Sequence, residues 1–432
     1  MWHRLRLGFM TEKASKTFKA RAEGGRRGRL FAVCANPSQT PGTALFRGVL
    51  RKGGIATLSL LTLAFAGCRR HDFPQYSPNY REYAYVTNGD SGTVSVLDVA
   101  NVRLDREVAV GQRPVAVAAS PTRNEVYVVN SGAAGGQGSL SVINAENNSV
   151  AATIPLHRQP VSMDVDAAHN LGYVSNSGSN TVSVIDLKAR REVAQVGTGE
   201  QPVDAQVAPD GKTVVVANRG GNSVSIIDAA TRSVRAIFEG CPGANDAVVL
   251  PDSSKAFVAC AGGHQVMAIA LAHSKFNPGA PDRLEALVDV GRAPLQLALK
   301  PDGGELFVSN SQSGSISEVV TTTDDVGGAY LMGDNPVNGI VSTDNALLYV
   351  SNLTAQEVTM YSTEDGRRMS PSIHVGDGPS AMAFSTAGHL LFVVDSRSGD
   401  VAVVRTASHS LFTMLPAGRG PNAIAVKAFK AP

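Results

Sequence analysis

The sequence predicts an all-β fold, an eight-bladed β-propeller made of four-stranded antiparallel blades. Two observations support this prediction: a four-residue motif recurs at nearly constant intervals, and a proline precedes it at a fixed distance. The motif copies are Tyr85–Asn88, Tyr127–Asn130, Tyr173–Asn176, Val215–Asn218, Phe257–Cys260, Phe307–Asn310, Tyr349–Asn352 and Phe392–Asp395. Their fourth positions are separated by 42, 46, 42, 42, 50, 42 and 43 residues. A period near forty built from short β-type runs is typical of a propeller, with one small sheet per repeat.

Each repeat contains four strand-like runs separated by turn residues. In the fourth copy these runs are residues 202–207, 215–218, 223–228 and 233–238. Alternating and β-branched residues favour strands in all four. The turn Pro209-Asp210-Gly211 separates the first two runs, because proline presets one dihedral angle and glycine frees another. The repeat therefore predicts one four-stranded blade.

The first two strands of each repeat form a hairpin of constant length. The interval from the opening proline to the fourth motif position is 16 residues in six copies, and Ala244 to Cys260 keeps the same interval with both residues replaced. We expect this hairpin to be the inner one, because strands crowded around the axis cannot absorb insertions.

The order of the runs also predicts how the ring closes. The first copy lacks its own opening strand, whereas the chain ends with an opening-type run, Pro421 to Val426, that has no hairpin partner after it. Pairing these two would complete one blade and hide two edges that would otherwise be exposed. Counted in this way the ring has eight blades, and seven blades is the alternative.

The Tyr-Val-Thr-Asn quartet of residues 85–88, the Gly-x-x-Pro before the opening strand and the Pro-Asp-Gly turn resemble the YVTN-repeat β-propellers of bacteria and archaea. The resemblance covers about residues 84–432. It implies the propeller fold, and it implies little about activity because function resides in loops that differ between members.

The first 83 residues have a different character. Residues 49–67 combine Arg51 and Lys52 with an uncharged run from Gly53 to Gly67, about 15 residues long, which fits a signal-peptide core and is too short for a membrane span. The run ends at Phe65-Ala66-Gly67-Cys68, which resembles a bacterial lipobox and so implies lipidation of Cys68; an ordinary buried cysteine is the alternative. Residues 1–48 are expected to be a non-native upstream extension or unstructured, and residues 68–83 a tether. By resemblance to the usual sorting rule, Arg69 after the anchor implies the outer membrane, facing the periplasm.

The charge balance disfavours nucleic acid as a partner. Twelve of the 39 Lys and Arg residues, but only two of the 37 Asp and Glu residues, precede Cys68, so the rest of the chain has a net charge of −8. An acidic body repels phosphate backbones.

Acidic and amide side chains in the opening strands are candidate ligand-binding residues. Asp204, Asp246 and Asn338 lie two places after the opening position, and Asp164 lies four places after it. Buried carboxylates need donors, water or a cation. Asp164, Asp204 and Asp246 therefore predict either a site for a hard cation such as Ca²⁺ or a structural role in binding neighbouring backbone amides.

The loops that lead into the opening strands form a second candidate site. They carry charges of both signs: Arg113, Arg158, Arg292 and Arg419, together with Glu200, Asp334 and Asp377. We expect them to surround one mouth of the channel, where they form either a rim for a polar or anionic ligand or simply a solvated loop surface.

Cys241 and Cys260 occupy the loop glycine and motif asparagine positions of one repeat. In an antiparallel hairpin these two positions lie at the same end, so a disulfide is a hypothesis, and export would permit it.

These observations favour a monomeric cell-envelope lipoprotein that acts as a binding scaffold for envelope proteins or a small polar ligand, attached to the membrane by its lipid alone. The alternative is a hydrolase of the propeller lactonase kind, or a metal-dependent enzyme, that uses the channel-mouth acids. The sequence predicts no catalytic residue and no cofactor other than the candidate Ca²⁺.

Overall fold

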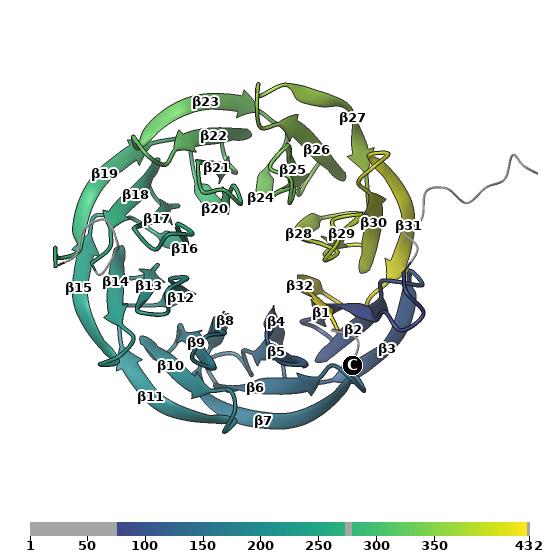
Figure 1. The fold of residues 1–432 in the computed structure, drawn as a ribbon, viewed down its shortest axis with the longest axis horizontal. Coiled ribbons are helices and arrows are strands. Elements are labelled where there is room, and N and C mark those ends of the chain that lie inside the picture. Colours follow the sequence, from purple (N-terminus) through teal and green to yellow (C-terminus); the bar gives the residue numbers. More distant parts are fainter. Residues whose placement is uncertain (1–75, 273–278, 430–432) are drawn as a thin grey trace, which may run out of the picture. The chain divides into compact units, whose positions relative to one another are not determined.

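The computed structural model describes residues 76–272 and 279–429, which form a closed ring of eight four-stranded antiparallel sheets (Figure 1). Within residues 76–272 and 279–429, no helical segment has the length and hydropathy that a membrane span requires. The sites expected at Cys68 and within residues 1–67 lie outside the described residues.

Each blade contributes one strand to each of four concentric positions. The innermost strands are β32 (Pro421–Ala428), β4 (Pro114–Ala119), β8 (Pro160–Asp166), β12 (Pro202–Val207), β16 (Ala244–Val249), β20 (Pro294–Leu299), β24 (Pro336–Val341) and β28 (Pro379–Phe384). The second strands, which carry the motif, are β1 (Glu82–Asn88), β5 (Glu125–Asn130), β9 (Leu171–Asn176), β13 (Thr213–Asn218), β17 (Lys255–Cys260), β21 (Glu305–Asn310), β25 (Leu347–Asn352) and β29 (Leu390–Asp395).

The third strands are β2 (Thr93–Asp98), β6 (Gln137–Asn144), β10 (Thr181–Asp186), β14 (Ser223–Asp228), β18 (Gln265–Ala270), β22 (Ser315–Val320), β26 (Glu357–Ser362) and β30 (Asp400–Arg405). The outermost strands are β3 (Arg103–Ala109), β7 (Ser149–Arg158), β11 (Arg191–Gly197), β15 (Ser233–Glu239), β19 (Arg283–Asp289), β23 (Asp325–Leu331), β27 (Arg368–His374) and β31 (Ser410–Pro416). We number the blades 1 to 8 in chain order of their second strands, so blade 1 holds β32, β1, β2 and β3.

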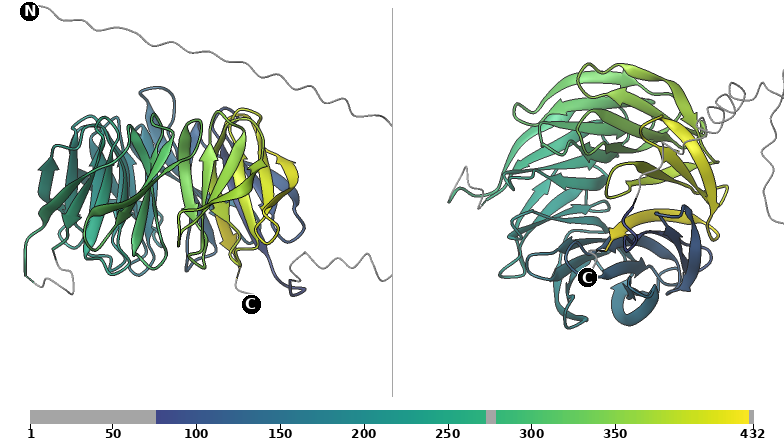
Figure 2. Two further views of the ribbon diagram at one scale, coloured as in Figure 1. Left: turned by 90° about the horizontal axis from the view of Figure 1, so that it is seen from above. Right: turned by 45° about the vertical axis from the view of Figure 1, so that its right-hand side comes forward.

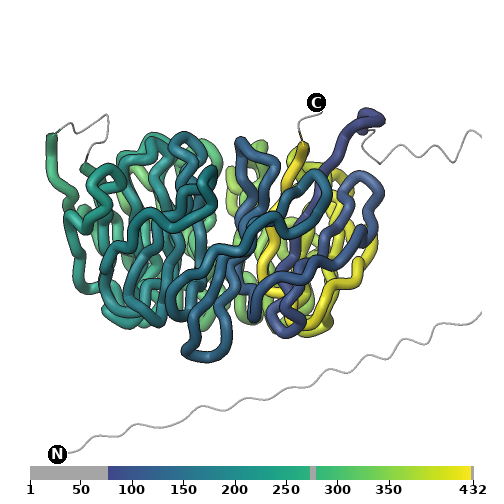
Figure 3. Tube along the Cα trace, turned by 90° about the horizontal axis from the view of Figure 1, so that it is seen from below, coloured from purple at the N-terminus to yellow at the C-terminus, as the bar shows by residue number. Residues whose placement is uncertain are grey.

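The ring closes by pairing its two ends. The C-terminal strand β32 runs antiparallel to β1, from Glu82 opposite Ala428 to Asn88 opposite Pro421 (Figures 1 and 3). The backbone N–H of Gly89 donates to the carbonyl of Gly420 at 2.8 Å just beyond this pairing. The prediction of eight blades closed through blade 1 is confirmed, and the seven-blade alternative is wrong.

The core is divided into eight apolar clusters, one between each pair of neighbouring blades. Between blades 1 and 2, for example, Tyr85, Val94 and Val96 pack against Val126 and Val128, and all five side chains are fully buried. This explains the aromatic and β-branched motif residues, because both faces of the two middle strands are covered by other blades.

The loops that join one blade to the next share an unusual backbone conformation. All eight residues that precede the innermost strands have positive φ, namely Arg113, Gln159, Gln201, Gly243, Ala293, Asn335, Gly378 and Gly420. The sequence did not reveal this feature, since the residue before a proline normally prefers extended backbone. Backbone hydrogen bonds hold the conformation: Ser131 N–H donates to Arg113 O at 2.9 Å, and Ser177 N–H donates to Gln159 O at 2.9 Å. These hydrogen bonds place the crossing loops against the second-to-third strand loops on one face of the ring, which we call the crossing-loop face. Figure 2 shows the ring from the side, with loops on both of its faces.

Candidate functional site

The three aspartates predicted to lie near the axis sit on three consecutive innermost strands, and each reaches the next blade. Asp164 of β8 accepts hydrogen bonds at 2.8 Å from the Val207 N–H and the Gln206 side-chain amide. Asp204 of β12 accepts from the Ala247 N–H at 3.1 Å. Each carboxylate therefore satisfies a backbone donor on a strand edge that has no further strand to pair with.

The same arrangement continues beyond the three aspartates. Asp246 of β16 accepts from the Leu297 N–H at 2.7 Å, and Gln296 of β20 accepts from the Gly339 N–H at 2.7 Å through its side-chain oxygen. We call Asp164, Asp204, Asp246 and Gln296 the inner belt. Asn338, the remaining predicted residue near the axis, lies partly buried on β24.

Two further side chains join neighbouring innermost strands and were not predicted. Asn245 donates to Leu295 O at 2.6 Å, and Asn422 donates to Pro114 O at 3.0 Å. Both follow the opening position directly, where every innermost strand has a register shift against its partner, as between Pro202 and Asp204. This bulge changes the side-chain alternation on which the sequence prediction relied.

Burial governs the charge of the inner belt. It raises the pKa of Asp204 to about 7, with the nearby Asp164 carboxylate adding to the effect and the Ala247 N–H opposing it. It also raises the pKa of Asp246 well above the usual range, with Asp204 as the second cause. The pKa of Asp164 is raised for the same first reason. Because neighbouring carboxylates of Asp164, Asp204 and Asp246 repel one another, the three do not readily ionise together. They therefore keep protons at pH values where isolated aspartates would lose them.

The described ranges contain no group of three or more His, Cys, Asp or Glu side chains placed to hold one metal ion. The backbone amides already supply donors to Asp164, Asp204 and Asp246. The Ca²⁺ hypothesis therefore has no ligand set in the described part of the chain, and the structural alternative accounts for the contacts that the three aspartates make.

Replacing Asp204 by Asn should reduce the pH dependence of stability. The pKa of Asp204 is higher in the folded than in the unfolded chain, so its contribution to stability is present below about pH 4 and is lost as the pH rises through about 7. The amide keeps an oxygen for the Ala247 N–H, so we expect a gain of about 1–3 kcal/mol at pH 8 and little change at pH 4, measured by urea unfolding. If Ca²⁺ instead stabilises the wild type and D204N abolishes that effect, the aspartates act as a cation site.

The predicted rim residues lie where expected, on the crossing-loop face, but they do not all meet. Arg113, Arg158, Arg292 and Arg419 are exposed, as are Glu200 and Asp334, whereas Asp377 is partly buried. The Arg158 side chain donates to Gly135 O at 3.0 Å. Two further arginines on this face were not predicted: Arg219, which donates to Asn245, and Arg397, which lies 3.6 Å from Asp377.

One pair of rim arginines shares a pocket. Arg397 and Arg419 line a pocket of about 460 Å³ between blades 8 and 1, with Ser91, Ser398 and Glu107. The loops around it are tied together, since Arg419 N–H donates to the Ser91 hydroxyl at 2.7 Å. The residues that line this pocket could be predicted only once the pairing of β1 with β32 was known, because Ser91 and Arg419 lie at opposite ends of the propeller sequence.

Cys241 and Cys260 form a disulfide in the structure, with Cα atoms 4.8 Å apart and both residues fully buried. Other blades show why both positions changed together. A Cβ atom at Gly111 would lie 2.6 Å from the Asn130 side chain, and one at Gly199 would lie 2.7 Å from Asn218. In these two blades a side chain at the loop position would clash with the motif asparagine, although blade 3 combines His157 at that position with Asn176. In blade 5 the cysteine pair replaces the glycine–asparagine contact.

Breaking this disulfide should cost about 2–4 kcal/mol, because it closes a loop of 19 residues. We expect that loss in the Cys241→Ala, Cys260→Ala double variant, measured by urea unfolding without reductant. The Cys241→Gly, Cys260→Asn double variant should recover part of it by restoring the contact of the other blades. Two accessible thiols in unreduced wild-type protein would contradict the pairing.

The comparisons with known proteins agree with this architecture. A family model described as YNCE-like beta-propeller matches residues 140–429. No curated protein sequence matches the chain significantly.

Several solved structures are similar in fold. Apo AztD from Citrobacter koseri has a TM-score of 0.61 and 14% identity, covering 82% of this chain and 99% of its own. Dihydro-heme d1 dehydrogenase NirN in complex with DHE has a TM-score of 0.63 and 14% identity, covering 83% and 78%. A putative 6-phosphogluconolactonase from Bacteroides uniformis has a TM-score of 0.57 and 15% identity, covering 81% and 100%. Identities this low show a shared fold alone. Because the family model covers about two thirds of the chain, the chain belongs to the YNCE-like β-propeller family.

Proposed function

We propose that this chain is an exported, lipid-anchored binding protein of the cell envelope, attached through Cys68 to the outer membrane and facing the periplasm. In this proposal it acts as a monomeric scaffold, and its crossing-loop face binds an acidic group of an envelope partner.

The observation that carries the proposal is the pocket shared by Arg397 and Arg419. Both arginines extend from loops that are tied together, and their guanidinium groups are fork-shaped donors that suit a carboxylate of a partner protein. Neither loop needs to become ordered on binding, so little conformational entropy would be lost.

The contacts of the inner belt also favour binding over catalysis. Asp164, Asp204 and Asp246, the acids considered for an enzymatic site, each accept a hydrogen bond from a neighbouring innermost strand. Burial is the first cause of their raised pKa values, and structural networks also perturb pKa values in this way.

A site-specific cross-linking experiment tests the proposal. A photo-reactive residue placed at Ser398, beside the arginine pocket, should yield a discrete adduct in cells that make the full-length chain. The Arg397→Glu, Arg419→Glu double variant should lose the adduct through charge repulsion, whereas Arg367→Glu, on the opposite face, should keep it. Cys68→Ser should move the protein out of the membrane fraction.

Two results would overturn the proposal. One is an adduct that is insensitive to reversing both pocket charges. The other is turnover of lactones by the purified chain that is lost in the Asp204→Asn, Asp246→Asn double variant, since this would favour the hydrolase alternative.

A further inference from the structure

The outermost strand of each blade ends its sheet, so its outer edge has no strand to pair with. An unpaired edge can pair with another chain, and natural proteins prevent this with charged residues or prolines in the strand. Six of the eight outermost strands carry such a residue between their first and last positions, namely β3, β7, β11, β15, β19 and β27. The two exceptions are β31 and β23.

Of these two, β31 is protected in another way and β23 is open. The guanidinium of Arg405 lies 4.2 Å from the centre of the Phe412 ring of β31, and that strand ends at Pro416. On β23, by contrast, Leu331 is 81% exposed, more than any other large apolar side chain of the described residues. The edge of blade 6 therefore lacks the protection of the other edges.

The neighbouring strand carries a second departure from the pattern of the other blades. Glu318 of β22 pairs with Phe307, the first motif residue of blade 6. The same position in the other seven blades is apolar and buried, and it holds Val96, Val142, Val184, Ile226, Ala268, Met360 and Val403. On its other side Glu318 pairs with Gly328 of β23, and Gly327 is the extra residue of the bulge there. Glycine weakens a strand interior, so neither feature is explained by the stability of the blade.

The two glycines keep the Glu318 carboxylate accessible from the outer strand. A Cβ atom at Gly328 would lie 2.7 Å from the Tyr330 hydroxyl oxygen, and one at Gly327 would lie 3.6 Å from Glu318 Oε1. The Tyr330 hydroxyl donates to Oε2 of Glu318. Within the described ranges no hydrogen bond reaches Oε1, so one oxygen of this half-buried carboxylate is left for an incoming donor.

Backbone groups of β23 also face outward. The Met332 N–H donates to Gly314 O at 2.9 Å, on the side of β22. Strand alternation therefore turns the groups of Leu331 and Ala329 away from β22. The Leu331 carbonyl accordingly accepts from the Tyr361 hydroxyl of blade 7 at 2.7 Å. The Leu331 N–H and both backbone groups of Ala329 are thus directed to the position of a further strand.

The charge around this edge has one sign. Residues 318–334 contain four acids and no Lys or Arg. One of the acids, Asp324, is neutralised by Lys255, whose Nζ lies 2.7 Å from Oδ1 of Asp324. The acids that remain are Glu318, Asp325 and Asp334. A cationic partner complements this edge.

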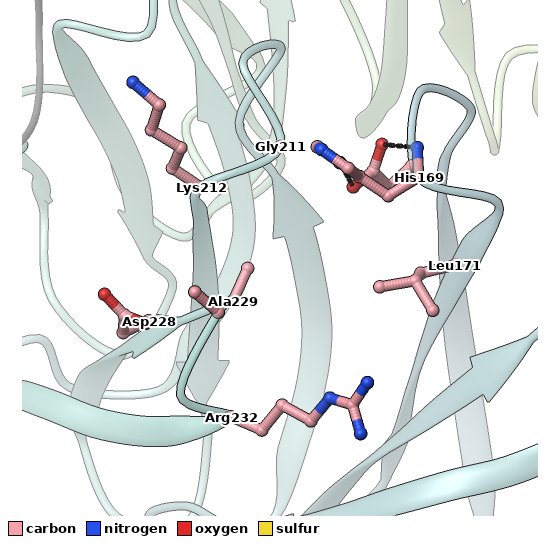
Figure 4. Close-up of a pocket in the computed structure, with 9 residues that line it drawn as sticks. His169, Leu171, Gly211, Lys212, Asp228, Ala229 and Arg232 are labelled. Atoms are coloured by element: carbon pink, nitrogen blue, oxygen red, sulfur yellow. Dashed lines mark hydrogen bonds and ion pairs between the residues drawn. The ribbon is translucent and has the colours of Figure 1, made fainter.

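The pocket between blades 3 and 4 differs in this respect (Figure 4). Its volume is about 410 Å³, and its lining combines Lys212 and Arg232 with Asp166 and Asp228. Charges of both signs select neither an anion nor a cation, whereas the edge of β23 selects against anions.

We propose that the outer edge of β23 binds an extended, basic segment of another protein, which adds to blade 6 as a fifth strand. Its backbone pairs with Ala329 and Leu331, a lysine or arginine beside the two glycines reaches Glu318 Oε1, and an apolar residue contacts Leu331. In this mode of recognition backbone pairing supplies affinity and alternate side chains supply specificity. The glycines, the acid and the exposed leucine each break a local rule, and such departures are expected at functional sites. The edge is separate from the arginine pocket between blades 8 and 1, so the proposal stands independently of the function proposed above.

The probe for the test is a fluorescein-labelled peptide, Ser-Val-Lys-Val-Thr-Val-Lys, which as a strand has valines on one face and lysines on the other. Its anisotropy with the full-length chain should rise saturably in the micromolar to millimolar range. Ala329→Pro should weaken binding about tenfold, because it removes an outward N–H from an edge strand. Glu318→Gln should weaken it about threefold to tenfold. Gln195→Pro, at the equivalent exposed position of blade 3, is the matched control and should leave the affinity unchanged.

A second peptide, N-methylated at alternate residues, keeps the charge and cannot pair as a strand, so it should bind at least about tenfold more weakly. Absence of saturable binding, equal binding of the methylated peptide, or an equal loss in Gln195→Pro would each overturn the proposal. Self-association of the chain that Ala329→Pro abolishes would also overturn it, because the edge would then pair with a second copy. Thermal unfolding of each variant checks that the fold is intact, and Leu331→Lys, at an exposed side chain, provides a further variant that should weaken binding without unfolding the blade.

Discussion

A chain that ends before Pro421 should lose more than about 5 kcal/mol of stability or fail to accumulate as soluble protein. The deletion removes β32, the innermost strand of blade 1, and so exposes the whole inner edge of β1. It also removes Ile424 and Val426 from the cluster between blades 8 and 1, and the contact of Asn422 with Thr87 at 2.6 Å. An exposed edge of this kind promotes pairing with other chains.

The measurement is thermal unfolding by circular dichroism together with size-exclusion chromatography of the soluble fraction. A circular permutant that places residues 417–429 and a short turn in front of β1 is the matched control. It restores the inner hairpin of blade 1 in the order found in every other blade, so it should unfold close to the wild-type temperature. Unchanged unfolding of the truncated chain would show that closure contributes nothing.

Replacing Asp395 by Asn should stabilise the protein by about 2–4 kcal/mol at pH 7–8. Asp395 occupies the motif asparagine position of blade 8 and is fully buried. In other blades the asparagine amide donates to hydroxyls on the third strand, as Asn218 does to Ser225 at 2.9 Å. In blade 8 those positions hold Asp400 and Ala402, so a carboxylate faces another acid and a methyl group.

The electrostatics give the sign of the effect. Burial raises the pKa of Asp395 to about 8 and the Asp400 charge adds to the shift, while the Gly376 and Ala402 backbone amides oppose it. Between about pH 4 and pH 8 the folded chain therefore holds a proton on Asp395 that the unfolded chain has lost, so the free energy of unfolding falls as the pH rises through this range. The amide of D395N removes this requirement and can donate to Asp400, so the gain should vanish near pH 4.

Urea unfolding across this pH range, with wild type and D395N compared, measures the effect. Asn352→Asp is the reciprocal control, because it places an acid at the same position in blade 7 and should introduce a loss of stability at neutral pH. Parallel pH profiles for wild type and D395N would contradict the proposed protonation of Asp395.

Local pattern and spacing were sufficient to predict the fold. The 16-residue interval from proline to motif fixed the inner hairpins, and the unpaired run at Pro421 indicated closure with β1. Both depend on residues near in sequence, or on simple counting of equal units. The blade number followed because every repeat builds the same sheet.

The candidate site was predicted only in part. The sequence singled out Asp164, Asp204 and Asp246 as anomalous, but not their acceptance of N–H groups from the next blade, because the bulge and the positive-φ crossing loops leave no clear pattern in the sequence. It named Arg419 but not its neighbour Arg397, and it gave no sign that Glu318 pairs with a glycine of the edge strand of blade 6.

The sequence by itself thus determined the repeat, the number of blades and the pairing of the two ends of the propeller. The tertiary structure alone decided which polar groups of one blade meet those of the next. The physical reason is that each blade is specified by contacts within about forty residues, whereas contacts across a junction depend on how the closed ring orients neighbouring sheets.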